Sequence, residues 1–91
     1  MVYRVLIDPA ADRELDKLDV AVSKRILKFL HERVAKLDDP RNIGEALKGS
    51  KLGTFWKYRV GDYRIIASIE DKFLRILVVH IGHRGDVYKN A

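Results

Sequence analysis

Hydrophobic and polar residues alternate most regularly over residues 54–68, where the sequence predicts two strands joined by a tight turn. Gly61 and Asp62 are typical of a two-residue hairpin loop, which would place Arg59 directly opposite Arg64. Side chains alternate between the faces of a strand, so one face should be buried and the other exposed. The face expected in the core comprises Trp56, Tyr58, Val60, Tyr63, Ile65, Ala67 and Ile69. The opposite face comprises Phe55, Lys57, Arg59, Arg64, Ile66 and Ser68.

Two amphipathic helices are predicted ahead of this hairpin. Residues 2–7 are a β-branched and aromatic run, which predicts a strand that ends at Asp8. Asp8 suits the N-cap and Pro9 the first turn of a helix, because the N–H that proline lacks is unpaired there. A second, longer helix should be capped by Asp19 and end before Pro40. Its apolar stripe repeats every three or four residues: Val22, Ile26, Phe29, Leu30, Val34 and Leu37.

A last strand is predicted at residues 73–81, apolar on both faces and therefore central in its sheet. Strict alternation would set one face, Leu77, Val79 and Ile81, against the other, Leu74, Ile76 and Val78. The element order is then β-α-α-β-β-β, with the helices packed as an antiparallel hairpin. We expect an α+β fold in which this helical hairpin covers a mainly antiparallel four-stranded sheet. The 91 residues support one core, so residues 1–91 should form a single domain.

Composition narrows the classes of function. Eighteen Lys and Arg against 13 Asp and Glu give a net charge of +5, which favours a polyanionic partner. The absence of cysteine excludes a disulfide framework and a cysteine-type zinc site. No apolar run reaches the ~20 residues of a membrane span, and the amino terminus lacks a signal-peptide pattern. We therefore expect a soluble cytoplasmic protein without a membrane partner.

Positive charge gathers on the exposed face of the predicted hairpin. Like charges directly across a strand pair are destabilising, so the cluster of Lys57, Arg59 and Arg64 calls for an explanation. An anionic ligand is one, and a chain phosphate is the ligand we expect. Alternatively, the cations pair with nearby carboxylates: Asp62, Glu70 and Asp86. Two further basic residues come just before the hairpin: Lys48 and Lys51.

The histidines differ in what their surroundings predict. His31 lies in a charged helix and is interpreted as solvated, whereas His80 lies in the last strand and fits a core or rim position. His83 lies in a glycine-flanked loop, where packing does not require it, and is a candidate ligand contact. Trp56 and Tyr58 fall on the core face, which favours packing over base stacking. No Gly-rich phosphate loop, nucleophile elbow or metal-ligand spacing occurs, so no metal or cofactor is expected.

Two motifs carry a family resemblance: Lys-Tyr-Arg-Val-Gly-Asp-Tyr-Arg at 57–64 and Gly-His-Arg at 82–84. Together with Leu-Lys-Gly at 47–49 and Val-Tyr at 87–88, they resemble the RelE family of bacterial and archaeal toxins, in the RelE/ParE superfamily. The resemblance covers nearly the whole chain, including the strand order and the helical hairpin. A RelE-like fold is therefore expected.

The resemblance implies a ribosome-dependent endoribonuclease, an mRNA interferase that cuts messenger RNA in the A site. In that family the 2′-hydroxyl attacks the adjacent phosphate and no metal is used. Lys57 matches a lysine proposed as base or charge stabiliser, and Tyr88 matches a tyrosine that orients the nucleophile. Arg64 and Arg84 match the arginines that hold the phosphate. RNA contacts are then expected from Arg59, His83, Lys48 and Lys51.

The chain departs from the family pattern at two positions. Phe55 stands where the pattern has a second strand lysine, and His83 stands where a lysine precedes the last arginine. Losing a cation should weaken phosphate stabilisation, while His83 could supply an acid or base. The arginines near Lys57 should lower its pKa toward the range of a base. Tyr88 could instead only pack the tail onto the sheet.

The resemblance also implies partners. A RelB-like antitoxin that is partly disordered should fold across the toxin, forming a hetero-oligomer, and the ribosome and messenger RNA should be the targets. Two alternatives stay open. A ParE-like toxin would bind and inhibit DNA gyrase without a catalytic site of its own. A non-catalytic nucleic-acid-binding module would show salt-dependent affinity without cleavage.

Overall fold

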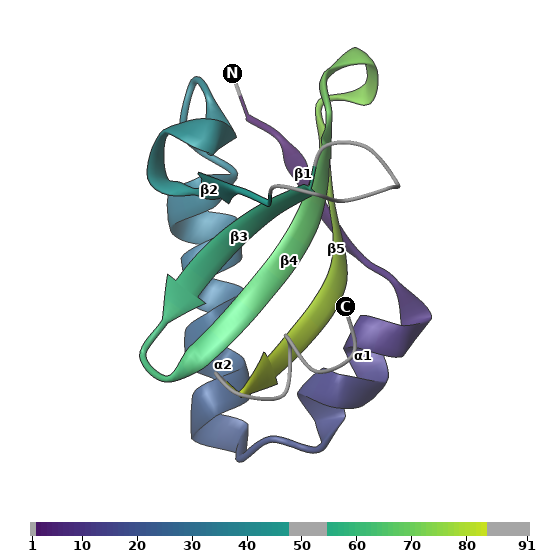
Figure 1. Ribbon diagram of the computed structural model, residues 1–91, viewed down its shortest axis with the longest axis vertical. Helices are drawn as coiled ribbons and strands as arrows, with labels where there is room; N and C mark the ends of the chain where they lie inside the picture. Colours follow the sequence, from purple (N-terminus) through teal and green to yellow (C-terminus); the bar gives the residue numbers. More distant parts are fainter. Residues whose placement is uncertain (1, 48–54, 84–91) are drawn as a thin grey trace.

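Two helices cover one face of a five-stranded sheet with the strand order β1-β5-β4-β3-β2 (Figure 1). The computed structural model describes residues 2–47 and 55–83. Its strands are β1 (Arg4–Ile7), β2 (Glu45–Ala46), β3 (Phe55–Val60), β4 (Tyr63–Glu70) and β5 (Arg75–His83). Its helices are α1 (Pro9–Asp16), α2 (Val20–Lys28), a π-helix (Phe29–Val34) and two 3-10 helices (Pro40–Ile43 and Asp71–Phe73). The predicted α+β class is confirmed.

The sheet has one strand more than the four predicted. Strand β2 is two exposed residues long and pairs antiparallel with β3. So short a strand has no alternating pattern by which the sequence could mark it. The sheet is mainly antiparallel, as predicted, because only β1 pairs in parallel, with β5. Strand β5 lies between β1 and β4, the central position that its apolar sequence predicted.

Helix α1 begins where its capping residues predicted. Asp8 occupies the N-cap and its side chain accepts a hydrogen bond of 3.1 Å from the Ala10 N–H, with Pro9 in the first turn. Helix α2 follows Asp19, but that side chain makes no capping hydrogen bond, contrary to expectation. The two helices run in opposite directions, as predicted (Figure 1). They are tied by a 2.8 Å hydrogen bond from the Ser23 hydroxyl to the Leu15 carbonyl.

The β3–β4 hairpin has the predicted register. Arg59 lies opposite Arg64, and the two-residue loop is Gly61-Asp62. Gly61 has a φ of 59°, a left-handed value that glycine adopts without steric strain. A positive φ at the first loop residue alone is typical of a type II′ turn, whose twist matches that of paired strands.

Strand β5 contains a bulge that strict alternation did not predict. Ile66 pairs with His80 while its neighbour Ala67 pairs with Val78, so Val79 is the extra residue. The bulge reverses the alternation from that point. Ile81 therefore shares the core face with Val78, and its predicted grouping with Val79 was wrong.

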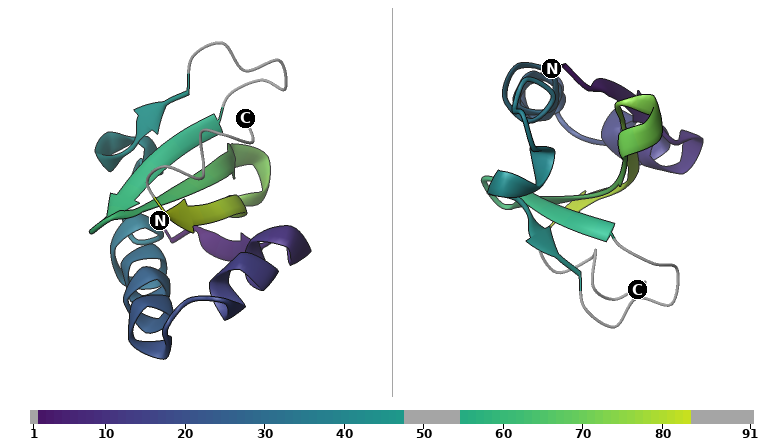
Figure 2. Two further views of the ribbon diagram at one scale, coloured as in Figure 1. Left: turned by 60° about the horizontal axis from the view of Figure 1, so that its bottom comes forward. Right: turned by 90° about the horizontal axis from the view of Figure 1, so that it is seen from above.

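The hydrophobic core lies between the helices and one face of the sheet, as the view from above shows (Figure 2). Most of its largest fully buried side chains come from the apolar stripe of the second helix, from the hairpin and from β5: Ile26, Leu30, Val34, Tyr58, Ile65, Ile76, Val78 and Ile81. No helix in the described part of the chain is long and apolar enough to cross a membrane. The opposite face of the sheet carries the predicted cationic residues.

Candidate active site

The strand register brings the predicted cationic residues together on the sheet face opposite the helices. Lys57 and Arg59 lie on β3, and Arg64 lies on β4 directly across from Arg59. The three belong to one face because residues at even spacing along a strand, and residues paired across strands, point the same way. The tight turn at Gly61 fixes this register, so the local sequence itself builds the cluster.

Arg64 is the most unusual of these residues. It is only 4% exposed, and it is the one charged residue among the buried residues of the described chain. Its Nε and Nη1 atoms are buried and have no hydrogen-bond partner among the described residues. A buried polar group without a partner costs ~1–3 kcal/mol, and more when it is charged. The side chain therefore presents buried donors of positive charge, which an anion accepting two hydrogen bonds would satisfy.

Lys57 is not a free amine. Its Nζ lies 3.4 Å from Oε2 of Glu45 on β2, the residue directly across the strand pair. The lysine side chain is 18% exposed and the glutamate side chain 70% exposed. The carboxylate favours the ammonium form of Lys57, which opposes the effect expected from the neighbouring arginines. Glu45 was not anticipated, because the two-residue strand that carries it has no sequence signal.

The alternative that carboxylates neutralise the whole cluster is only partly realised. Glu70, one of the carboxylates considered, forms a two-pronged ion pair with Arg75, with N–O distances of 2.9 and 2.8 Å. The hydrogen bonds from Arg75 lower the pKa of Glu70. Arg59 is exposed and has no ion pair with the other described residues. Asp86 lies outside the described residues.

His83 is the last residue of strand β5, so its predicted place in a loop was wrong, and it lies away from the cationic face. It pairs across the strands with Tyr63, and the two rings meet edge to face with centroids 5.6 Å apart. Tyr63 packs against the core under the helices, whereas Arg64 points the other way, opposite Gly82. The described structure therefore brings Lys57, Arg59 and Arg64 together, but not His83. Four predicted site residues lie outside the described residues: Lys48, Lys51, Arg84 and Tyr88.

The other predictions for aromatic and histidine residues are confirmed. Tyr58 is 1% exposed, its hydroxyl donates a 2.6 Å hydrogen bond to the Pro40 carbonyl, and burial raises its pKa to about 12. His31 is exposed. His80 is a rim residue, with Nδ1 2.8 Å from Oε1 of Glu14. Oε1 of Glu14 also accepts a 3.3 Å hydrogen bond from the backbone N–H of Ile81 on β5.

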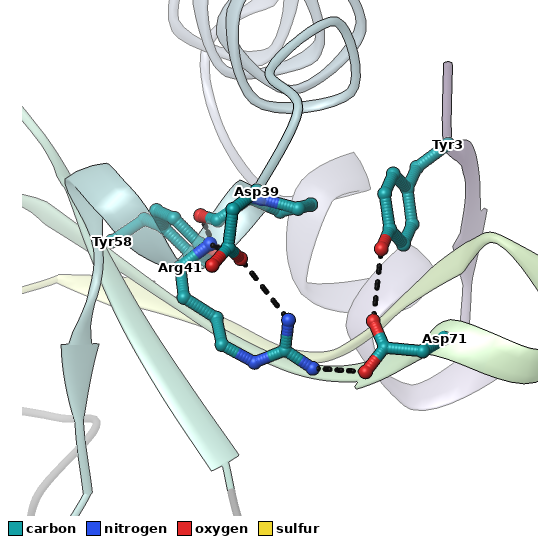
Figure 3. A network of polar contacts seen from close by, with 6 residues as sticks. Tyr3, Asp39, Arg41, Tyr58 and Asp71 are labelled. Atoms are coloured by element: carbon teal, nitrogen blue, oxygen red, sulfur yellow. Dashed lines mark hydrogen bonds and ion pairs between the residues drawn. The ribbon is translucent and has the colours of Figure 1, made fainter. Parts of the chain in front are cut away.

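A polar network that the sequence did not predict holds the base of the hairpin (Figure 3). Arg41 contacts Asp39 at 3.1 Å and Asp71 at 2.7 Å, and Asp71 accepts a 2.8 Å hydrogen bond from the Tyr3 hydroxyl. The guanidinium of Arg41 also lies 5.9 Å from the centre of the Trp56 ring. These bonds from Arg41 and Tyr3 lower the pKa of Asp71. The partners are up to 68 residues apart in sequence, so no local pattern could reveal them.

Metal-binding side chains do not gather in the described part of the chain. No group of three or more His, Cys, Asp or Glu residues there could hold a metal ion. The cationic side chains of the described site can supply hydrogen bonds and positive charge to an anion.

The sequence and the fold match a known class of small proteins. A family model described as "ParE toxin of type II toxin-antitoxin system, parDE" matches residues 5–88. The chain therefore belongs to this family of type II toxins. More particularly, its relatives identify it as a toxin of the RelE family, as the motifs predicted.

Toxin RelG of Mycobacterium tuberculosis is 28% identical over 89 residues, covering 98% of this chain and 99% of that protein. Toxin RelE of the same organism is 29% identical over 87 residues, covering 96% of this chain and 87% of that toxin. Among solved structures, the RelE–RelB complex of Pyrococcus horikoshii matches with a TM-score of 0.74 and 30% identity, over 94% of this chain and 99% of that one. The RelBE2 toxin–antitoxin complex of M. tuberculosis matches with a TM-score of 0.83 and 24% identity, over 94% and 95%.

Proposed function

We propose that this toxin is a ribosome-dependent endoribonuclease that cuts messenger RNA in the ribosomal A site and thereby inhibits translation. The observation that carries the proposal is the buried Arg64, whose Nε and Nη1 nitrogens have no hydrogen-bond partner among the described residues and which has two further cations beside it. A phosphodiester is an anion that accepts such bonds, and a toxin that only blocked a protein partner would have no need of them. The match to relatives named RelE supports the same reading.

The proposed reaction transfers the phosphoryl group within the RNA. The 2′-oxygen attacks the adjacent phosphorus and the bond from phosphorus to the 5′-oxygen breaks, which leaves a 2′,3′-cyclic phosphate and a 5′-hydroxyl. A base takes the proton of the 2′-hydroxyl, and a donor protonates the departing 5′-oxygen. Negative charge grows on the equatorial oxygens in the transition state, so donors aimed at those oxygens lower the barrier. No metal takes part in this scheme.

Roles in that reaction follow from the charges. We assign Arg64, together with Arg84, to the equatorial oxygens, and Tyr88 to orientation of the nucleophile. For Lys57 we favour stabilisation of charge over proton abstraction, because Glu45 lies 3.4 Å from its Nζ and favours the ammonium form. Phe55 takes the place of a family lysine on the same strand, so the reaction relies on fewer cations.

Four further residues are proposed to bind RNA around the reacting phosphate: Arg59, His83, Lys48 and Lys51. Arg59 is exposed beside Arg64 and suits a neighbouring phosphate. His83 lies with Tyr63 on the other side of the sheet, so its contact would be with a flanking nucleotide, and we do not assign it the acid or base role.

The proposed partner outside the ribosome is a RelB-like antitoxin. Solved neighbours from M. tuberculosis and P. horikoshii are complexes of a toxin with its antitoxin. An antitoxin that covers the cationic face would block Arg64 and form a hetero-oligomer. Because translation takes place in the cytoplasm, the toxin would act there.

Primer extension on messenger RNA after induction of the full chain tests the proposal. We expect cuts that recur in register with the reading frame and that disappear with Arg64→Met. Lys57→Met should reduce cleavage by about 100-fold, because a charge on the phosphate is lost. Lys72→Met, which removes an exposed lysine outside the cluster, is the matched control and should cut normally.

A gyrase supercoiling assay run alongside distinguishes the proposed endoribonuclease from the main alternative, a toxin that inhibits gyrase. The matched family model is named for ParE, so inhibition of gyrase is the second candidate. Toxicity without cleavage of messenger RNA, accompanied by loss of supercoiling, would contradict the endoribonuclease proposal.

A further inference from the structure

A basic groove runs between the second helix and the tip of the β3–β4 hairpin. It encloses about 510 Å³, with α2 and the π-helix on one side and residues 59–61 on the other. In Figure 1 this helix lies beside and behind β3. The positively charged residues that line the groove are Arg25, Lys28, Arg33 and Arg59. Among the described residues that line it, Glu32 is the only acidic one.

The positive charge of the groove is not neutralised within the described structure. The four cationic residues are exposed, and their side chains form no ion pair or hydrogen bond with other described residues. Four positive charges therefore face one negative charge across a concave surface. The guanidinium of Arg25 reaches across the groove to the hairpin tip. Its Nη1 lies 3.6 Å from the position that a Cβ atom at Gly61 would occupy. A concave surface of one sign concentrates oppositely charged ligands.

The helical residues that line the groove form one stripe along α2 and the π-helix. Arg25, Lys28, Phe29, Glu32 and Arg33 follow one another at intervals of three, one, three and one residues, the spacing that places side chains on one face of a helix. The stripe continues across the junction of the two helices, so Arg33 lines the groove together with Lys28.

The groove is continuous with the candidate active site. Arg59 lines the groove and also lies directly opposite Arg64 across the hairpin. A chain of phosphates that passes Arg64 could therefore continue over Arg59 into the groove. An anion bound in the groove would not need to compete for the reacting site.

We propose that this groove binds the sugar–phosphate backbone of RNA outside the phosphate that is cleaved. Three of its four cations are arginines, whose planar donors suit phosphate oxygens. The apolar lining side chains do not favour a protein helix as the occupant, since Val60 is 7% exposed and the Phe29 ring packs edge to face with Tyr58. An amphipathic helix needs open apolar pockets for its anchor residues. The inference rests on the proposed function in taking RNA as the ligand, but it does not depend on cleavage.

The test measures binding of the full chain to a single-stranded RNA with 2′-O-methyl groups, which cannot be cut. The variant Arg25→Gln, Lys28→Gln, Arg33→Gln removes three groove charges. The control Lys17→Gln, Lys24→Gln, Lys36→Gln removes three exposed charges outside the groove. Both lower the net charge from +5 by three to +2, so any difference between them comes from position and not from total charge.

We expect the groove variant to raise the dissociation constant about tenfold or more and the control to change it by less than about threefold. The slope of log affinity against log salt should flatten by about 2 in the groove variant, because each lost phosphate contact removes ~0.7. Equal effects in the two variants would overturn the inference. So would a groove variant that keeps its RNA affinity but binds the cognate antitoxin more weakly, which would assign the groove to protein.

Failure of the inference and failure of the proposed function are separable. If the groove variant loses RNA affinity while the unaltered toxin cuts no messenger RNA, the groove stands and the endoribonuclease proposal falls. If messenger RNA is cut in frame and the groove variant binds RNA normally, the endoribonuclease proposal stands and the groove inference falls. Melting temperatures of both variants should stay near that of the unaltered chain, because all six side chains are exposed.

Discussion

The two faces of the β3–β4 hairpin come from the same strands, yet they treat buried polar groups in opposite ways. On the helix-covered face, Tyr58 is 1% exposed and its hydroxyl is satisfied by the Pro40 carbonyl at 2.6 Å. On the other face, Arg64 is 4% exposed, and its Nε and Nη1 find no partner in the described part of the chain. These two residues are almost equally buried, so the burial of a residue alone does not distinguish core from site.

What distinguishes the faces is whether the fold supplies the hydrogen-bond partner. A fold selected only for stability would replace an unpaired buried charge with an apolar side chain of similar size. Leaving Nε and Nη1 of Arg64 without a partner among the described residues costs free energy, and an anion that bound there would offset that cost. The comparison therefore supports stability as the role of the helix-covered face and binding as the role that we propose for the cationic face.

Arg64→Met should have the largest effect on function and little effect on the fold. Losing a donor aimed at the developing charge should lower RNA cleavage by about 100- to 1,000-fold. The free energy of unfolding should stay the same or increase, because an unpaired buried charge is replaced by an apolar side chain. Cleavage kinetics and urea unfolding of the same preparation measure both quantities.

Arg4→Met is the matched control for that experiment, because Arg4 is an exposed arginine on β1. It should leave both cleavage and stability nearly unchanged. A loss of stability of several kcal/mol in Arg64→Met would contradict the assignment of Arg64 to binding, since it would mean that the fold itself satisfies the guanidinium.

Ile65→Ala, one residue along the same strand, should show the opposite result. Ile65 is 0% exposed in the core under the helices, and truncating a buried isoleucine to alanine costs ~2–5 kcal/mol. Cleavage per folded molecule should fall by less than about threefold when measured well below the melting temperature. A large loss of cleavage in fully folded Ile65→Ala would show that the two faces are not as independent as the comparison requires.

The sequence predicted the elements whose signals are local. The cap at Asp8-Pro9 and the register around Gly61 depend on residues adjacent in sequence, and both are confirmed. The register alone was enough to bring Lys57, Arg59 and Arg64 onto one face. The motifs that indicated the RelE family are likewise short stretches of residues adjacent in sequence.

Features that depend on partners far apart in sequence escaped prediction. The bulge at Val79 could not be recognised, because a strand that is apolar on both faces gives no sign of a shift in alternation. The shift matters for the site, since in the described structure His83 lies with Tyr63 and not with Arg64. Glu45 beside Lys57 and Asp71 beside Arg41 are likewise contacts of tertiary structure, which no periodicity encodes.

Tyr58→Phe tests the helix-covered face, where the buried hydroxyl has a hydrogen-bond partner. It should lower the free energy of unfolding by less than Ile65→Ala. Removing the hydroxyl leaves the Pro40 carbonyl without its partner, which costs ~1–3 kcal/mol. The variant should also change how the stability of the fold depends on pH in alkaline solution. Burial raises the pKa of Tyr58 from 10.0 to about 12, so the neutral form stabilises the fold below pH 10 and that contribution is lost as the pH rises toward 12.

Urea unfolding of the unaltered chain and of Tyr58→Phe between pH 9 and pH 12 measures this difference, and the variant should lose less stability over the range. Parallel pH curves would mean that the phenol is not held in its neutral form by the core. A Tyr63→Phe variant is the control, because Tyr63 is only half-buried at the end of the hairpin and should leave the pH dependence in place.

Asp71→Asn should have the smallest effect, and it separates charge from hydrogen bonding at the base of the hairpin. The amide oxygen of asparagine can accept the hydrogen bond from Arg41, and its NH₂ group can donate one to the Tyr3 hydroxyl, so both contacts can form without the charge. Those bonds lower the pKa of Asp71 below its ordinary value of 3.8, and a carboxyl with a lowered pKa stabilises the fold above that value. The contribution disappears as the pH falls through the lowered pKa, so the two proteins should differ slightly at pH 6 and converge once the pH is below that pKa. Because the Asp71 side chain is 60% exposed, 1 M salt should also shrink the difference at pH 6, whereas it should leave the cost of Ile65→Ala unchanged. A difference that persists at low pH and high salt would show that Asp71 holds the hairpin by geometry alone, and not by charge.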